Sequence, residues 1–268
     1  DAADEIFLEW TSLIGAPFHS HEFERMIAGL LEVRGATNRF SELPKPLYVG
    51  ATDQDARRAV LFGEEGYARV PISRSVQASL SINPAFGGVR IDDRYYEDGA
   101  ITRTSNYVEA IEHGARLVFV LDPFVPYVSK QAGHNNKRGM LYNLDQDVRT
   151  LSFTRFESVR DLTLRERPEV SSYTFLPANS QRKLLSVNPM DHRPFLAIWR
   201  AAYLSTLQRL ELVEHRLAGD LAVRGRRLDL SRAKVVAERL RRRGAIDFGD
   251  FYPERRVSIR RHPLVGER

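Results

Sequence analysis

Residues 47–121 decide the fold and read LYVGATDQDARRAVLFGEEGYARVPISRSVQASLSINPAFGGVRIDDRYYEDGAITRTSNYVEAIEHGARLVFVL. This stretch begins and ends in short apolar runs rich in β-formers, Leu47–Val49 and Leu117–Leu121. Such runs are typical of buried parallel strands. A helical segment, a turn-rich segment and the acidic turn Glu97–Ala100 lie between them. The order of these signals predicts an α/β fold.

The interior of the stretch contains further strand and helix signals. Three runs predict short strands joined by tight turns: Arg58–Phe62, Val89–Ile91 and Arg94–Tyr96. Two runs predict helices: Ile72–Ile82 and Tyr107–His113. Pro84 ends the first helix because proline cannot continue the pattern. The turn at Asp92-Asp93 makes the last two strands a hairpin, which delivers Asp98 to the next turn.

Four features of the stretch occur in a fixed order. They are the strand end Ala51-Thr52-Asp53, the pattern S-x-x-A-S-x-x-x-x-P at Ser75–Pro84, the turn Asp98-Gly99-Ala100, and the helix and strand of Glu109–Val120. In this order they resemble the second half of the patatin-like phospholipase domain. The resemblance implies a three-layer α/β fold, with helices on both faces of a mainly parallel sheet. We expect this hydrolase domain in residues 1–180 and a helical C-terminal extension in residues 181–268.

The resemblance also implies a chemistry. In that family a serine in a G-x-S-x-G elbow and the aspartate of the D-G turn form a dyad that cleaves lipid esters, with no cofactor. Asp98 is then the general base. The chain contains no G-x-S-x-G motif, and no Gly-rich oxyanion loop precedes Leu47. We therefore expect the nucleophile in a segment upstream of Asp1, in the same polypeptide or in a separate chain.

A carboxylate is a weak base unless its surroundings assist it. A serine hydroxyl attacks an ester only when a group within hydrogen-bond reach takes its proton. We expect burial against Tyr95 and Tyr96 to raise the pKa of Asp98. Gly99 is expected to give the turn a backbone conformation closed to residues with a Cβ. A D-G dipeptide alone is an ordinary surface turn, so the interpretation depends on the ordered set around it.

The other polar candidates have structural interpretations. Asp53 is expected to brace its strand end, and Ser79 to pack or hydrogen-bond within a helix. Asn83-Pro84 is expected to shape the cleft near Asp98. The sequence predicts no metal site, because no pair of histidines has the His-x-x-x-His spacing with a glutamate. A Ser–His–Asp triad remains an alternative, but it lacks an elbow serine.

The composition is ordinary for a soluble globular protein, with 268 residues of which 43% are hydrophobic and 28% charged. No apolar run is long enough for a transmembrane helix. The absence of cysteine excludes disulfides and thiol nucleophiles. The net charge is +5, and arginines gather at 224–227, 239–243 and 255–261. These groups favour anionic lipid or nucleic acid, or else a solvated helix face with acidic neighbours such as Glu238.

Helical patterns flank the central stretch at residues 4–14, 20–35, 141–159 and 195–244. Ser20 and Gly35 are the expected N-cap and stop of the second of these helices. The third has its expected apolar positions at Leu144, Val148, Leu151 and Phe156. Residues 170–176 predict a last strand. The apolar faces of the first two helices, and of residues 195–217 in the last, would line an acyl-chain groove or pack as ordinary core.

Functions of different classes follow. The first is a serine acyl hydrolase acting on phospholipid, lysophospholipid or neutral lipid, in the cytoplasm or at a membrane surface. The second is a lipid-binding or scaffold protein that kept the fold and lost the nucleophile. A nucleic-acid surface on the arginine groups is the third and weakest interpretation.

Overall fold

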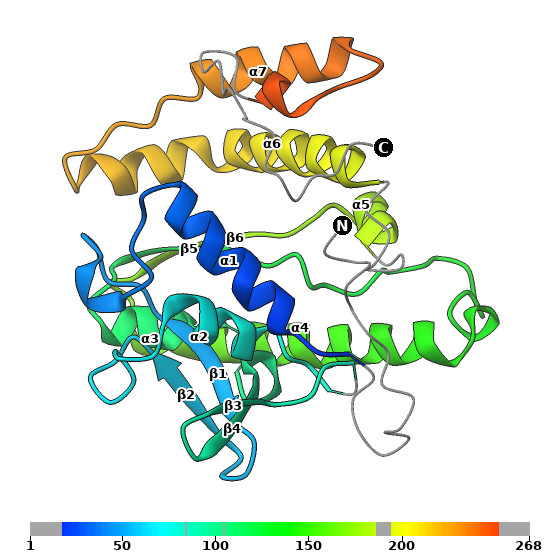
Figure 1. Cartoon of the computed structure of the whole chain (residues 1–268). Helices are drawn as coiled ribbons and strands as arrows, with labels where there is room; N and C mark the ends of the chain where they lie inside the picture. Colours follow the sequence, from blue (N-terminus) through cyan, green and yellow to red (C-terminus); the bar gives the residue numbers. More distant parts are fainter. Residues whose placement is uncertain (1–17, 84, 104, 186–193, 252–268) are drawn as a thin grey trace. The chain divides into compact units, whose positions relative to one another are not determined.

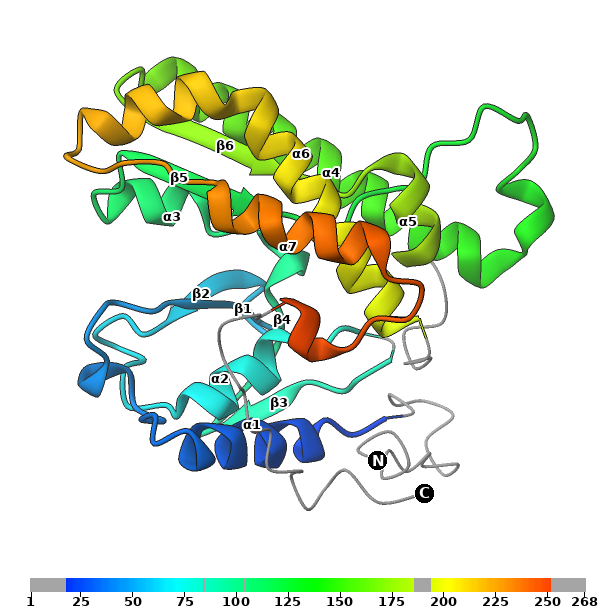
Figure 2. The same cartoon turned by 90° about the horizontal axis from the view of Figure 1, so that it is seen from above.

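A computed structural model describes residues 18–83, 85–103, 105–185 and 194–251, and these form two compact units (Figures 1 and 2). The first unit contains the described residues up to Asn106, and the second those from Tyr107 onward. The helix expected at 4–14 and the arginines at 255–261 lie outside the described residues. The boundary between the two units, after Asn106, is defined by contacts and does not test the expected hydrolase domain of residues 1–180, which stays a prediction.

The first unit contains a four-stranded antiparallel sheet in the order β2-β1-β4-β3. Its strands are β1 Val49–Asp53, β2 Arg58–Phe62, β3 Val89–Ile91 and β4 Arg94–Asp98. The predicted hairpins are confirmed, and their turns contain Arg57 and Asp92 with positive φ. The expectation that β1 is a parallel strand is wrong. Both of its neighbours, β2 and β4, run antiparallel to it. For β2 the reason is the short turn that joins it to β1, since such a turn can return the chain only in that direction.

Two helices pack on this sheet in succession. α2 (Ile72–Ser79) lies against β1 and β4, and α1 (His21–Val33) lies against α2, as Figure 2 shows. α1 agrees with the predicted helix, and Gly35 follows it with a φ of 62°. α2 ends at Ser79, earlier than predicted. The chain leaves the helix there because the Ser81 carbonyl accepts a hydrogen bond from Asp98 N, at 2.9 Å.

The core of the first unit lies between α2 and the sheet. Phe62 is fully buried, and its ring meets those of Tyr67 and Tyr96 edge to face at 5.5 and 5.2 Å. The other buried members of this cluster are Phe40, Ala51, Val60, Val70, Ile72, Ala78 and Val89. Burying one such large side chain contributes about 1.5–3 kcal/mol. The core therefore fixes the strands from which Asp53 and Asp98 project.

The second unit is built on a parallel pair of strands, β5 (Leu117–Leu121) and β6 (Ser171–Phe175). Figure 1 shows this pair between α6 (Phe195–Ala222) and the helices α3 (Tyr107–Glu112) and α4 (Met140–Glu166). One face of the pair packs on α3 and α4 through Val118, Val120, Tyr107, Ile111 and Phe156. The other face packs on α6 through Tyr173, Phe175 and Leu217. Helices thus cover both faces of the parallel pair, and the protein is a mixed α/β structure.

The long helix α4 presents an unexpected face to the core. Its existence is confirmed, and Phe156 is buried with 3% of its surface exposed. Leu144 and Leu151 belong to the same predicted set of apolar positions as Phe156, but they are 50% and 70% exposed. The residues that turn inward beside Phe156 are polar: Gln146, Arg149 and Ser152. A network of hydrogen bonds, described below, satisfies Gln146 and Arg149 and accounts for this orientation.

The described C-terminal part is helical, as expected for residues 181–268. It contains α5 (Asn179–Leu185), α6, α7 (Ser231–Arg242) and the 3₁₀ turn Phe248–Phe251. The single helical pattern expected at 195–244 is in fact two helices, because Gly225 takes a φ of 66° after α6 and redirects the chain. α7 packs on α6 through Leu207, Leu230 and Ala237.

Candidate active site

The backbone of Asp98 is held on both sides by buried neighbours. Asp98 is the last residue of β4 and lies opposite Ala51 of β1. Its N–H donates to the Ser81 carbonyl at 2.9 Å. Its carbonyl accepts from Thr52 Oγ1 at 2.9 Å, and that hydroxyl also lies 2.8 Å from Thr102 Oγ1. Because Thr52 and Ser81 are fully buried, these two hydrogen bonds hold the backbone of Asp98 in place.

The carboxyl group of Asp98 begins the turn that follows β4. Its Oδ1 accepts a hydrogen bond from Ala100 N at 2.7 Å, as a capping residue does at the start of the 3₁₀ turn Gly99–Ile101. Burial raises the pKa of the Asp98 carboxyl above its ordinary value; the Ala100 N–H opposes this shift, and the charge of Glu97 adds to it. A raised pKa makes the carboxylate a better proton acceptor.

The expected direction of this pKa shift agrees with the structure, but Tyr95 is not its cause. Tyr95 is 42% exposed and stands on the opposite face of β4 from Asp98. Tyr96 is buried and belongs to the core on the Asp98 face. The burial that acts on Asp98 therefore comes from the core side of the sheet.

Gly99 is needed for a reason other than the expected one. Its φ does not lie in the positive region, so the turn requires no conformation that is closed to other residues. A Cβ at this position would instead stand 2.7 Å from the Gly50 carbonyl oxygen and 2.9 Å from the Gly50 carbonyl carbon. The absence of a side chain at Gly99 lets the Asp98 turn lie directly on the backbone of β1.

Two buried carboxylates flank the site and are paired. Glu97 accepts from Asn83 Nδ2 at 2.5 Å and forms an ion pair with Arg57 at 3.4 Å. Asp53 forms an ion pair with Arg94 at 3.0 Å and caps the β1–β2 turn by accepting from Ala56 N, also at 3.0 Å. Asp53 thus braces its strand end, as predicted.

No serine of the described chain donates a hydrogen bond to the Asp98 carboxylate. Ser79 is the last residue of α2. Ser81 is fully buried, and its hydroxyl donates to the Gln77 carbonyl at 2.8 Å. Ser20 is the N-cap residue of α1 by position, but its hydroxyl bonds Ser81 and Gln77 instead of the helix end. Within the described residues the site therefore contains a candidate base and no paired nucleophile.

No family model and no curated protein matches this chain. What the site can do must then be argued from its own chemistry. A desolvated carboxylate with a raised pKa, fixed at a strand end, is able to accept a proton from a hydroxyl group that approaches it.

Sequence reasoning selected Asp98 as a candidate and did not select the groups that hold it. Thr52, Ser81 and Glu97 are the buried polar residues around the turn. Thr52 at the strand end and Glu97 beside Asp98 are visible in the sequence. Neither residue type is specific enough to mark a functional site. Only the pairing of β1 with β4 brings them together.

Within the described residues, the remaining chemical candidates do not assemble into another candidate site. In the described ranges, no three His, Asp or Glu side chains lie together as a metal site would require. The rings of His19 and His21 stack at 6.0 Å, and burial, followed by the charge of Arg74, lowers the pKa of His21. His192 and His262 lie outside the described residues.

The last two arginines of α7, and Arg243 directly after it, have acidic partners. Arg241 and Arg242 pair with Glu238 at 2.6 and 3.9 Å, and Arg243 pairs with Asp250 at 2.7 Å. These contacts agree with the interpretation of a solvated helix face. Among the described helices, none combines the length and apolar character that a membrane span requires.

Proposed function

We propose that this chain is the C-terminal part of a patatin-like serine acyl hydrolase that cleaves carboxylic esters of lipids. Asp98 is its general base, and the serine comes from a segment upstream of Asp1. The observation that carries the proposal is the state of the Asp98 carboxyl: it is half-buried, its pKa is raised, and its Oδ1 is held by Ala100 N.

The reaction begins when the serine oxygen attacks the ester carbonyl carbon. Asp98, through Oδ2, takes the hydroxyl proton as the new C–O bond forms. The tetrahedral intermediate collapses, and the alcohol leaves with that proton. Asp98 then takes a proton from water, whose oxygen attacks the acyl carbon. The carboxylic acid leaves, and the serine regains its proton.

The backbone around Asp98 supports this role. A base must stay within hydrogen-bond reach of its nucleophile, and small displacements lower the rate strongly. The contacts of Asp98 with Thr52 and Ser81, and the close approach of Gly99 to Gly50, restrict the carboxylate to one position at the end of β4.

The parallel pair β5–β6 supports the three-layer part of the proposal. Parallel sheets are normally buried and extend over more than two strands. In the described part of the chain, β5 pairs only with β6, and its last residue Leu121 is 73% exposed. A further strand and its covering segment would complete this sheet in the proposed fold.

The test uses the polypeptide as its gene encodes it and a fluorophosphonate probe for activated serines. We expect one labelled serine upstream of Asp1 and turnover of lipid esters. Asp98→Asn should lower the labelling and turnover rates by about 10²–10⁴-fold, the usual contribution of a general base. The control is Asp92→Asn, in the exposed β3–β4 turn, because asparagine also tolerates positive φ.

Labelling of Asp98→Asn at the unaltered rate would overturn the role of Asp98. A wild-type polypeptide that binds lipid vesicles but shows neither labelling nor turnover would support the second function. In that case the protein is a lipid-binding scaffold, for which the absence of a serine paired with Asp98 in the described residues is the favouring observation.

A further inference from the structure

The second unit contains a cavity of about 310 Å³ where β5 and β6 end. It lies between these strand ends and the helices α5 and α6. Its walls are mostly apolar and include Leu121, Phe175, Leu185, Ile198 and Trp199. Ligands of α/β proteins commonly bind beyond the carboxyl ends of parallel strands, and pockets of this volume hold small molecules.

Local sequence explains why the space stays open. Pro123 and Pro177 follow β5 and β6 and line the cavity, and a proline cannot extend a strand ladder. On the opposite wall α6 presents the small side chains Ala201 and Ala202. A larger residue at either alanine would fill part of the volume. The cavity is therefore shaped by particular residues of both walls.

One wall residue, Asp122, has an unsatisfied polar atom. Asp122 follows β5 directly; its N–H donates to the Phe175 carbonyl at 3.1 Å, and its Oδ1 accepts from Phe124 N at 2.9 Å. Its Oδ2 is buried, and no group of the described residues bonds to it. Burial raises the pKa of Asp122, although the Phe124 N–H and the nearby arginines Arg149 and Arg182 oppose this. A buried oxygen without a hydrogen-bond partner destabilises the folded protein, and a bound donor would satisfy it.

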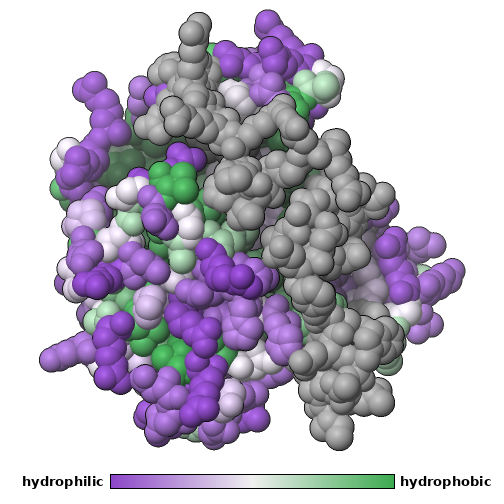
Figure 3. All heavy atoms as spheres, in the orientation of Figure 1, coloured by the Kyte–Doolittle hydropathy of each residue, from purple (hydrophilic) through white to green (hydrophobic). Residues whose placement is uncertain are grey.

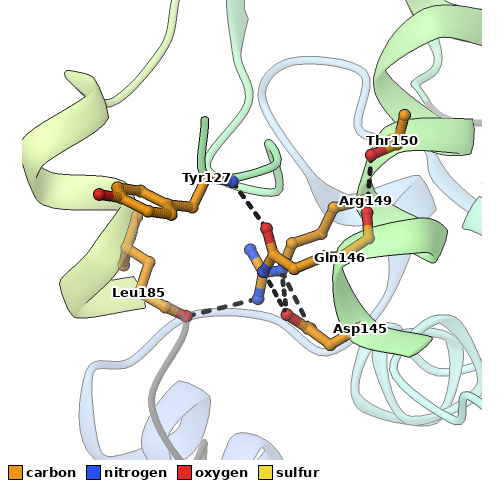
Figure 4. Close-up of polar contacts among 6 residues, drawn as sticks. All are labelled: Tyr127, Asp145, Gln146, Arg149, Thr150 and Leu185. Atoms are coloured by element: carbon orange, nitrogen blue, oxygen red, sulfur yellow. Dashed lines mark hydrogen bonds and ion pairs between the residues drawn. The ribbon is translucent and has the colours of Figure 1, made fainter. Parts of the chain in front are cut away.

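Arg149 and Arg182 are the two arginines whose charge lowers the pKa of Asp122, and both donate hydrogen bonds to other groups. Figure 4 shows that Arg149 donates through Nε to both oxygens of Asp145, at 2.8 and 3.0 Å. Its Nη2 reaches the Leu185 carbonyl at 3.4 Å, and its guanidinium lies 4.3 Å from the centre of the Phe124 ring. Arg182 donates to the carbonyls of Pro126 and Pro177 at 3.0 and 3.1 Å.

The same network of hydrogen bonds holds the loop that follows Asp122. Figure 4 also shows Gln146 of α4 accepting from Tyr127 N, at 2.7 Å. The loop that follows β5 is thus tied to α4, and α4 is tied through Arg149 to the end of α5. Asp122 stands in a fixed setting, so a ligand meets a preformed acceptor.

We propose that this cavity binds an aliphatic chain ending in a hydroxyl group, which donates a hydrogen bond to Asp122 Oδ2. The apolar walls receive the chain, and the carboxylate selects a donor over a pure acceptor. Fatty alcohols and monoacylglycerols have this chemistry. The inference does not rest on the proposed hydrolase activity, because it uses only residues of the second unit.

The probe for the test is 1-decanol, compared with decyl methyl ether, which has a similar chain and can only accept a hydrogen bond. The chain contains two tryptophans, so Trp10→Phe leaves Trp199 in the cavity wall as the only one. We expect 1-decanol to change the Trp199 emission saturably and to bind about tenfold more tightly than the ether. Equal affinities for alcohol and ether would overturn the role of Asp122.

Two pairs of variants separate the cavity from the rest of the unit. Ala201→Leu should abolish the response, whereas Ala233→Leu should not, because Ala201 lines only this cavity. Ala233 lines only the neighbouring cavity of about 390 Å³ between α6 and α7, which shares Trp199, Ala202 and Thr206 with the first. Asp122→Asn, whose Oδ1 can still accept from Phe124 N, should remove the preference for alcohol over ether. Asp147→Asn, at an exposed position of α4, should retain it. Binding that survives Ala201→Leu would overturn the proposed site, and the ligand comparison in the Trp10→Phe protein stands even if a variant does not fold.

Discussion

Gly99 lies against Gly50 so closely that a Cβ on Gly99 would stand 2.7 Å from the Gly50 carbonyl oxygen. Backbone occupies that space, so no side-chain rearrangement can relieve the contact. The turn that displays Asp98 and the strand β1 are thus in direct contact, with Thr52 of the same strand bonded to the Asp98 carbonyl. Any change that separates them moves the candidate base.

Gly99→Ala should therefore reduce both stability and activity. Forcing a methyl group into a filled space costs about 1–3 kcal/mol. The midpoint of urea unfolding, followed by circular dichroism, measures this loss. Gly66→Ala is the matched control, since a Cβ there meets nothing within 4 Å and its φ is not positive. A Gly99→Ala protein as stable as the control would contradict the close approach.

The raised pKa of Asp98 predicts a particular dependence of stability on pH. Because burial penalises the charged form in the folded state, the native protein holds the Asp98 proton more strongly than the unfolded chain does. The penalty is complete above the folded-state pKa and disappears as the pH falls below the ordinary value of 3.8. Asp98→Asn should accordingly be more stable than the wild type at pH 7, and this advantage should vanish below about pH 3.8.

Urea unfolding of both proteins at several pH values measures that difference. Activity should show the complementary trend, with turnover lost on the acid side at a pH above the ordinary pKa of an aspartate. An Asp98→Asn protein that is less stable than the wild type at every pH would show that the carboxylate is structural and not desolvated.

Asp53 is fully buried, whereas its partner Arg94 is exposed, so the loss of the ion pair affects mainly the buried carboxylate of Asp53. Removing Arg94 leaves a buried carboxylate that keeps the Ala56 N–H and loses its counter-charge. Arg94→Met should therefore lower the unfolding free energy more than Arg69→Met does, because Arg69 and its partner Asp92 are both exposed. Thermal unfolding of the two variants gives the ranking, and equal melting temperatures would refute it.

Local signals predicted most of the elements in the first unit. The hairpins of residues 49–62 and 89–98 were predictable because each is specified by a turn of a few residues between two strand-forming runs. The direction of β1 was not, since a short apolar run such as Leu47–Val49 suits either a parallel or an antiparallel neighbour. The contact between Gly99 and Gly50 was also hidden, because the two residues are 49 positions apart and meet only when β1 pairs with β4.

In the second unit the composition of a helix misled its interpretation. A stripe of leucine and valine normally marks the buried face of a helix. In α4 the buried polar residues Gln146 and Arg149 have partners that arrive from the loop after β5 and from the end of α5. Such partners are distant in sequence, so no local pattern announces them. Asp122 escaped notice for the same reason.

The exposure of the leucines of α4, together with the burial of Phe156, can be tested directly. Phe156 packs with Tyr107 edge to face at a ring separation of 6.1 Å, and truncating a buried phenylalanine costs about 3–5 kcal/mol. Phe156→Ala should destabilise the protein by that amount, whereas Leu151→Ala should change its unfolding free energy by no more than about 0.5 kcal/mol. Both variants remove apolar atoms from the same helix, so helix propensity cannot explain the contrast. Urea unfolding measures both values, and a large loss for Leu151→Ala would mean that this leucine is covered by another part of the protein.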